Sequence, residues 1–246
     1  MTSLRNKVAF VTGGSRGIGA AIVRRLVADG AAVAFTYVSS APKAEVLAAE
    51  LTQQGGQVLA VQADSADAAA LTAAIGQAAA AFGRIDILVN SAGIANSKSL
   101  EDHTLAEFRH MMAVHVEAPF VATQAVLPHM ADGGRIITIG SNLAERVPGA
   151  NTTLYATSKA ALLGLTKGLA RDLGPRRITV NLIQPGPTDT DMNPADGPYA
   201  DWMRNQMAIP EFGRGADVAA FVAWIASEES RFVTGAALTI DGGMSI

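Results

Sequence analysis

The sequence contains no cysteine in its 246 residues. This absence excludes disulfide bonds, thiolate zinc sites and cysteine nucleophiles, and it fits a reducing compartment such as the cytoplasm. Basic residues do not outnumber acidic ones, because the net charge at pH 7 is −3. Nucleic acid and anionic membranes bind basic surfaces, so we expect neither of them as a partner. We also expect no metal site.

Long hydrophobic runs are also missing. No apolar stretch approaches the ~18 residues of a membrane-spanning helix. The stretch Val8–Val11, which follows Arg5 and Lys7, is too short for the core of a signal peptide. The sequence therefore predicts a cytoplasmic globular protein without a membrane partner.

Strand-like and helix-like segments alternate along the whole chain. Apolar runs rich in β-branched residues predict strands, and the longer segments between them predict helices. The predicted strands are 8–12, 32–37, 57–62, 85–90, 135–140, 178–183 and 237–240, and the predicted helices are 18–28, 43–54, 67–82, 105–130, 153–173 and 218–226. Continuous apolar strands separated by helices are typical of a parallel sheet covered on both faces. No linker or repeat divides the chain, so we expect one α/β domain over 1–246.

One stretch, at about 188–215, does not follow this alternation. It is rich in Pro, Asp and Gly, and it carries an apolar patch at Trp202, Met203, Met207 and Ile209. A segment of this length is too long for a simple connection. We expect a substrate loop or lid here.

A glycine-rich turn follows the first predicted strand and leads directly into a helix. Glycines allow a tight turn and a close approach, and the helix N-terminus offers N–H groups to a pyrophosphate. The spacing is G-x3-G-x-G, which differs from the general dinucleotide fingerprint. We expect this turn to bind the phosphates of a dinucleotide through Gly13, Ser15, Arg16, Gly17, Ile18 and Gly19.

The end of the second predicted strand indicates which dinucleotide binds. An NAD site usually has a carboxylate there for the ribose 2′-hydroxyl. Positions 35–40 read Phe-Thr-Tyr-Val-Ser-Ser, and no carboxylate occurs before Glu45. A carboxylate would repel a 2′-phosphate, whereas Arg16, Ser39, Ser40 and Lys43 could bind one. The sequence therefore favours NADP(H) over NAD(H).

A second pattern carries the chemistry. Tyr155 and Lys159 are four residues apart in a predicted helix, so they share one face of it. That spacing alone also fits an amphipathic helix with a partly buried tyrosine. Ser141 follows a predicted strand upstream, at the carboxyl edge where open sheets bind ligands. The three residues together favour a catalytic site.

With these motifs in this order, the sequence resembles the short-chain dehydrogenase/reductase family over essentially its whole length. The matching positions are 12–19, Asp64, 90–93, Ser141, Tyr155, Lys159, Asn181, 185–186 and 241–243. The resemblance implies a Rossmann-type, doubly wound sheet of about seven strands in the order 3-2-1-4-5-6-7. It also implies a homotetramer.

The resemblance further implies the role of each site residue. Tyr155 would act as the general acid or base, Lys159 would lower its pKa from the usual ~10, and Ser141 would position the substrate oxygen. Cofactor contacts would come from Tyr37, Ser39, Ser40, Asp64, Ser65, Asn90, Ala92, Gly93, Tyr155, Lys159, Pro185, Gly186 and Thr188.

The sequence departs from the family pattern at His115, where the family usually has an asparagine that helps hold a water in a proton relay. An imidazole titrates near neutrality, so His115 could itself relay a proton. It could equally slow the relay or simply pack in its helix. We include it among the candidate catalytic residues. A second departure, Ser91 in place of another asparagine, is mild because Ala92 and Gly93 still follow.

The predicted substrate wall is apolar, with Leu143, Met192, Trp202 and Met207. Small ketones or secondary alcohols are therefore the expected substrates of an NADP(H)-dependent carbonyl reductase or alcohol dehydrogenase.

Two alternatives remain open. One is a 3-oxoacyl-[acyl-carrier-protein] reductase, which needs a basic docking patch to which Arg171, Arg176 and Arg177 could contribute. The other is a non-catalytic nucleotide-binding regulator, because positions 190–198 locally resemble a relative that binds cyclic dinucleotides. The retention of Ser141, Tyr155 and Lys159 favours catalysis.

Overall fold

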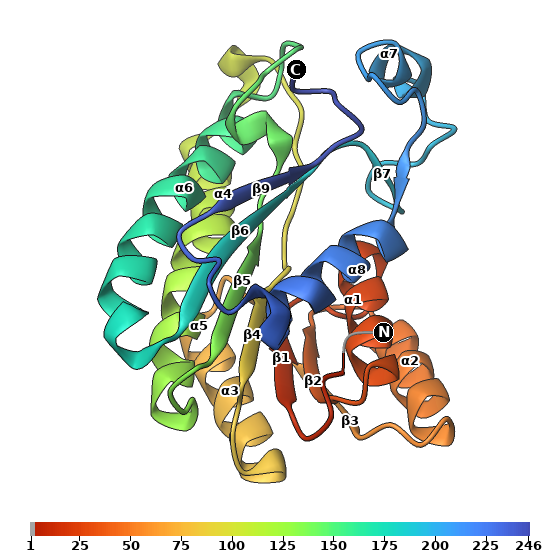
Figure 1. Ribbon diagram of the computed structural model, residues 1–246. Helices are drawn as coiled ribbons and strands as arrows, with labels where there is room; N and C mark the ends of the chain where they lie inside the picture. The colour runs from red at the N-terminus through yellow and green to blue at the C-terminus, as the bar shows by residue number, and fades with distance from the viewer. Residues whose placement is uncertain (1–2) are drawn as a thin grey trace.

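A seven-stranded parallel sheet forms the centre of the protein, in a computed structural model that describes residues 3–246. The strand order is β3-β2-β1-β4-β5-β6-β9, and every neighbouring pair is parallel (Figure 1). The strands are β1 (Val8–Val11), β2 (Ala32–Tyr37), β3 (Val58–Gln62), β4 (Ile87–Asn90), β5 (Arg135–Ile139), β6 (Thr179–Pro185) and β9 (Ala237–Ile240). This confirms the predicted Rossmann-type architecture and strand order, with β9 as the seventh strand.

Helices cover both faces of the sheet (Figure 1). One layer contains α1 (Gly17–Ala28), α2 (Ala41–Gln53) and α8 (Gly215–Ala226). The other contains α3 (Ala68–Phe82), α4 (Leu105–Met112), α5 (Ala118–Val126) and α6 (Thr153–Leu173). Helices form in every region where they are predicted, and α6 begins and ends where the pattern places it.

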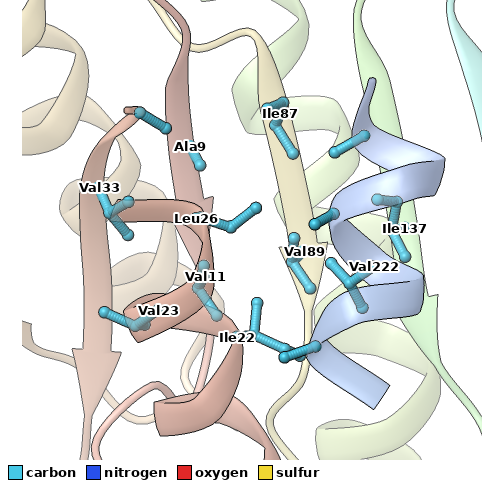
Figure 2. Close-up of a cluster of buried hydrophobic side chains, with 14 of the residues drawn as sticks. Ala9, Val11, Ile22, Val23, Leu26, Val33, Ile87, Val89, Ile137 and Val222 are labelled. Carbon is cyan, nitrogen blue, oxygen red and sulfur yellow. The ribbon is translucent and has the colours of Figure 1, made fainter. Parts of the chain in front are cut away.

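Alternation along each strand explains why the strands are apolar throughout. In β1, Ala9 and Val11 pack into the core cluster with α1 and α8, whereas Val8 and Phe10 pack into the cluster on the opposite face. Figure 2 shows part of the first cluster, where Ile22 of α1 and Val222 of α8 lie over the strands. In the central strands β1, β4, β5 and β6, burial on both faces leaves no position for a solvent-facing side chain.

The predicted helix 105–130 is not continuous. It consists of α4, a π-helical turn η2 (Ala113–Glu117), α5 and a 3₁₀ turn η3 (Leu127–His129). Pro119 has no N–H to donate to the carbonyl of His115, four residues earlier, so the α-helical ladder cannot continue through this point. The interruption places His115 in a π turn.

The irregular segment at 188–215 contains two short strands, β7 (Thr188–Asp189) and β8 (Gly213–Arg214), and a short helix, α7 (Ala200–Arg204). The two strands pair with each other, and α7 lies apart from the helices that cover the sheet (Figure 1). The N–H of Ile209 donates to the carbonyl of Gly242 at 2.8 Å, which ties the end of this segment to the C-terminal region.

We predict that Gly14→Ala lowers the free energy of unfolding by about 1–3 kcal/mol. A Cβ at this position would lie 2.5 Å from Cβ of Phe35 and 2.9 Å from Cγ2 of Val23, inside the core. Denaturant titration measures the change. Gly164→Ala in α6 is the matched control, because a Cβ there meets no atom within 4 Å. Since alanine is the better helix former, the control should gain up to about 1 kcal/mol. Equal changes in both variants would contradict the packing argument.

Candidate active site at the carboxyl edge of the sheet

The site lies where the central strands end. Thr12 follows β1, and its buried hydroxyl accepts hydrogen bonds from the N–H groups of Ser91 and Ala92, both at 3.0 Å. Ser91 and Ala92 follow β4, so one hydroxyl joins the ends of two strands that are distant in sequence. The predicted phosphate turn and the predicted 90–93 segment are thereby held side by side.

The glycine-rich turn has the backbone geometry that its sequence predicts. Gly13 and Gly17 adopt positive φ angles of 67° and 54°, which favour glycine. The N–H of Gly13 donates to Thr36 Oγ1 at 3.0 Å, which joins the turn to β2. Arg16 is the N-cap of α1, and its side chain makes no capping hydrogen bond. The first N–H groups of α1 therefore remain available to an anion.

Basic side chains gather beside this turn. A cavity of about 300 Å³ is lined in part by Ser15, Arg16, Arg24 and Lys43. Asp191, from the segment at 188–215, also lines it, and Lys43 Nζ lies 2.7 Å from Asp191 Oδ2. The structure thus brings the predicted Arg16 and Lys43 together. No sequence pattern indicated this role for Asp191, because it lies far along the chain from both.

Ser141, Tyr155 and Lys159 meet at the ends of β5 and α6. Lys159 Nζ donates to the carbonyl of Ile139 at 3.1 Å and lies 5.6 Å from the centroid of the Tyr155 ring. A hydrogen bond with Ser141 lowers the pKa of the Tyr155 phenol, against the larger effect of burial. The structure therefore brings the three residues of the predicted catalytic centre together.

The space beside Lys159 depends on Gly93. A Cβ at this position would lie 3.4 Å from His115 Nε2 and 3.8 Å from Lys159 Nζ. The absence of a side chain lets the backbone of this segment lie close to the imidazole and the ammonium group. This close approach and the uncapped α1 fit a dinucleotide that extends from the glycine turn to Tyr155.

Burial sets the protonation states of the two central residues. Burial raises the pKa of Tyr155, and the hydrogen bond with Ser141 opposes this rise only in part. Burial lowers the pKa of Lys159 from 10.5 to about 8. At neutral pH the phenol therefore carries its proton, as a general acid requires, and Lys159 is charged.

His115 is buried, with 1% of its surface exposed. Burial and then the charge of Lys159 lower its pKa to about 3. Both ring nitrogens have partners, the N–H of Ile94 at 3.0 Å and the hydroxyl of Ser158 at 2.8 Å. The ring is therefore neutral near pH 7. The hypothesis that this imidazole relays protons by titrating near neutrality does not fit this environment.

Several other expected cofactor residues also lie at the carboxyl edge. Tyr37 ends β2, Asn90 ends β4 and Pro185 ends β6. Asn90 donates to Thr138 Oγ1 at 3.3 Å and is buried, so its side chain helps hold the sheet together. The remaining expected residues follow strand ends: Ser39, Ser40, Asp64, Ser65, Ala92, Gly93, Gly186 and Thr188.

The expected substrate wall forms only in part. A Cβ on Gly149 would lie 3.2 Å from Cη2 of Trp202, so α7 reaches the loop after Ser141. Met192 is exposed. Met207, in contrast, is buried, and its Cε lies beside Gly242, where it anchors the segment. The expectation that Met207 lines the wall is corrected to an anchoring role.

Residues 3–246 contain neither a candidate metal site nor a helix suited to cross a membrane. No cluster of three or more potential metal-ligating side chains occurs there. Among the helices of this region, none has both the length and the apolar character needed to cross a bilayer. The cytoplasmic location stays a prediction from composition.

Known proteins share this arrangement. A protein-family profile described as enoyl-(acyl carrier protein) reductase matches residues 13–245. A short-chain dehydrogenase from Burkholderia cenocepacia, solved in complex with NADP, is 55% identical, with a TM-score of 0.98 and 99% of each chain covered. The chain belongs to the short-chain dehydrogenase/reductase family.

Two further relatives differ in their described properties. A blue fluorescent protein from a metagenomic library, solved in complex with NADPH, is 54% identical, with a TM-score of 0.98 and coverage of 99% of this chain and 100% of that one. The cyclic-di-GMP-binding biofilm dispersal mediator protein of Escherichia coli strain K12 is 45% identical over 242 residues, with 98% of each chain covered. Within one family, the present chain thus resembles both nucleotide-cofactor proteins and a cyclic-dinucleotide-binding protein.

We predict that Lys159→Met raises the free energy of unfolding at pH 7 by about 1–3 kcal/mol, because it removes a buried charge. Below pH 8 the parent carries this charge in the folded state. Between about pH 8 and 10.5 the folded parent loses the proton while the unfolded chain retains it. The parent therefore gains stability over this window, and the difference between the two proteins shrinks.

Denaturant titration at several pH values measures this effect. Lys167→Met, on the exposed side of the same helix, is the matched control and should change stability by less than about 0.5 kcal/mol. A destabilised Lys159→Met protein at pH 7 would show that the ammonium group contributes more to the fold than its burial costs.

Proposed function

We propose that the protein is an NADP(H)-dependent oxidoreductase that reduces ketones to secondary alcohols and catalyses the reverse reaction. The observation that carries this proposal is the convergence of Ser141, Tyr155 and Lys159 beside the backbone of Gly93. Bound NADPH supplies the hydride in this chemistry.

Each of the three side chains has a distinct role. Tyr155 donates its phenolic proton to the carbonyl oxygen as negative charge develops there. Ser141 donates a hydrogen bond to the same oxygen and fixes its position. Lys159 supplies a cation close to the phenol, which stabilises the phenolate that remains. In the oxidative direction, Tyr155 takes the proton back.

The protein holds the cofactor with the turn that begins α1. Its free N–H groups suit the pyrophosphate, and Arg16 and Lys43 suit an adenosine 2′-phosphate. The described relatives with bound NADP and NADPH support the same choice. Ser39 and Ser40, which follow the end of β2 after Val38, add hydroxyl donors where an NAD-binding protein would have a carboxylate.

The proposed substrates are small ketones with an apolar substituent. Trp202 and Leu143 lie on the segments that border the catalytic centre, and neither carries a charge that would fix a phosphate or carboxylate. The 3-oxoacyl-carrier alternative lacks support from its expected docking patch. Arg171 lies about 24 Å along α6 from Tyr155, at ~1.5 Å per residue, near the opposite edge of the sheet. Arg176 contacts the Met130 carbonyl there.

We predict that the purified protein oxidises NADPH in the presence of ketones and that Tyr155→Phe lowers kcat by at least about 100-fold. The loss follows because phenylalanine has no proton to donate. Absorbance at the nicotinamide band measures turnover over a panel of ketones and 3-oxoesters, with NADPH and NADH compared. The variant should keep most of its affinity for NADPH, since the phosphate turn is unchanged and only the hydroxyl of Tyr155 is lost from the expected cofactor contacts. Full turnover by the variant would remove Tyr155 from the proposed chemistry.

A second candidate function is cyclic-dinucleotide binding without turnover. The 45% identity with the E. coli biofilm dispersal protein supports it. Calorimetric titration with cyclic di-GMP, with and without NADPH, separates the two functions. Absence of turnover across the panel, together with tight cyclic-dinucleotide binding, would favour the regulatory function.

We also propose that the protein assembles as a homo-oligomer through α4, α5 and α6. An apolar hollow of about 450 Å³ opens there, lined by Phe108, Met112, Val116, Phe120 and Leu165 among others. Phe108 and Phe120 are exposed aromatic residues on this face. Aromatic side chains clustered on one surface are typical of protein interfaces.

We predict that the double variant Phe108→Asp, Phe120→Asp is a monomer, because it places charges in the apolar contact. Light scattering after size-exclusion chromatography measures the mass. Val46→Asp changes a more exposed apolar residue, on α2, and should leave the mass unchanged. A parent protein that is already monomeric would rule out this assembly.

A further inference from the structure

His115 connects three segments of the active site. It lies on the π turn between α4 and α5, where only 1% of its surface is exposed. Its ring meets the ring of Tyr155 edge-on, with centroids 5.6 Å apart and planes at 88°. Gly93 lies directly beside its Nε2 atom. The side chain is therefore adjacent to both the catalytic tyrosine and the segment expected to line the cofactor.

The hydrogen bonds of His115 determine which nitrogen carries the proton. The N–H of Ile94 can only donate, and it lies 3.0 Å from Nε2. Nε2 must therefore accept and carry no proton. In a neutral ring the proton is then on Nδ1, which lies 2.8 Å from Ser158 Oγ. The Nδ1–H group donates to that hydroxyl.

The hydroxyl of Ser158 continues the chain in the same direction. It donates to the carbonyl of Tyr155 at 2.7 Å, and a carbonyl can only accept. Each group in the chain from Ile94 to Tyr155 thus has one possible orientation. The chain joins the loop after β4 to the first turns of α6, with His115 at its centre.

This environment opposes a proton on Nε2. A protonated ring would direct an N–H toward the N–H of Ile94, so two donors would meet and one hydrogen bond would be lost. The charged and titratable groups around the ring are Lys159 and His110, which repel a cation, and Tyr155, which is protonated at neutral pH. Burial has the largest effect and acts in the same direction, and a backbone hydrogen bond with Ile94 opposes it only in part, so the pKa of His115 falls to about 3.

We propose that His115 is a positioning residue, a neutral imidazole with its proton on Nδ1, which sets the first turns of α6 through Ser158 and the cofactor-side loop through Ile94. It transfers no proton. This inference rests on the proposed reductase function for its kinetic consequences, but the protonation state can be tested independently of turnover.

Two substitutions separate the two contacts. The amide of asparagine reaches as far from Cβ as Nδ1 does, so His115→Asn can keep the donor to Ser158 and lose the acceptor for Ile94. The amide of glutamine reaches as far as Nε2, so His115→Gln can keep the acceptor and lose the donor. Each variant thus removes one of the two hydrogen bonds.

We expect a split in the kinetics of the two variants. His115→Asn should weaken NADPH binding about five- to tenfold with kcat nearly unchanged, because the Ile94 loop is released. His115→Gln should lower kcat by a similar factor with NADPH affinity nearly unchanged, because Ser158 and the turn of Tyr155 are released. Ser158→Ala should behave like His115→Gln. Thermal unfolding of each variant is the control, since a merely structural role would lower stability without this split.

Nitrogen NMR of the ¹⁵N-histidine-labelled parent tests the protonation state directly. The protein has only four histidines, so the variants identify the signals of His115 by their loss. We expect the Nδ1–H form from about pH 5 to pH 9, with no titration in that range. An Nε2–H form, or titration near pH 6.5, would overturn the proposal. If no ketone is reduced, the NMR and NADPH-binding measurements still decide between these outcomes.

Discussion

Parallel strands present their carboxyl ends at one edge of a sheet, and this protein uses that edge for its whole candidate site. The hydroxyl of Thr12 determines how closely the ends of β1 and β4 approach, because it accepts two backbone N–H groups from the neighbouring strand end. Gly13 can then lie against Ala92, where a Cβ would come within 2.8 Å of the Ala92 Cα. The phosphate turn and the segment 91–93 therefore share one support, and Gly93 of that segment lies beside Lys159.

Charge at the phosphate turn links this support to the segment at 188–215. Asp191 Oδ2 lies 2.7 Å from Lys43 Nζ. The hydrogen bond and charge of Lys43 hold the pKa of the Asp191 carboxyl below its usual value, and the charge of Arg16 has a smaller effect in the same direction. A 2′-phosphate bound as proposed would need the same cations, so a bound cofactor would compete with the carboxylate for them. Both partners are more than half exposed, and water screens the pair. The competition should therefore modulate the position of the segment near the cofactor without fixing it.

Sequence patterns were sufficient for the sheet because both of its faces are buried. Apolar runs then mark every strand, and α6 carries its motif within a regular helix. Sequence patterns were insufficient wherever a residue's role depends on a partner elsewhere in the chain. The pairing of Asp191 with Lys43 and the burial of Met207 beside Gly242 are such cases. The π turn had a local cause in Pro119, but periodicity alone treats that region as one helix.

The protonation state of His115 also depends on partners elsewhere in the chain. An isolated imidazole titrates near neutrality, and this property made His115 a candidate proton relay. Its actual behaviour follows from a backbone donor, a serine hydroxyl and a nearby ammonium group, none of which the local sequence indicates. Tertiary contacts converted a titratable side chain into a fixed structural link.

The burial of Lys159 favours catalysis over nucleotide binding without turnover. Its ammonium group is buried, with the Ile139 carbonyl as a hydrogen-bond acceptor, and burial makes its charged form unfavourable. A protein that only binds a nucleotide does not need a destabilising cation beside the phenol to hold the phosphates, since its phosphate turn lies elsewhere. An enzyme that must stabilise a phenolate does need that cation, and its position near Tyr155 is fixed by the helix that carries both residues. The cost of Lys159 to the fold is therefore best understood as a requirement of the proposed reaction.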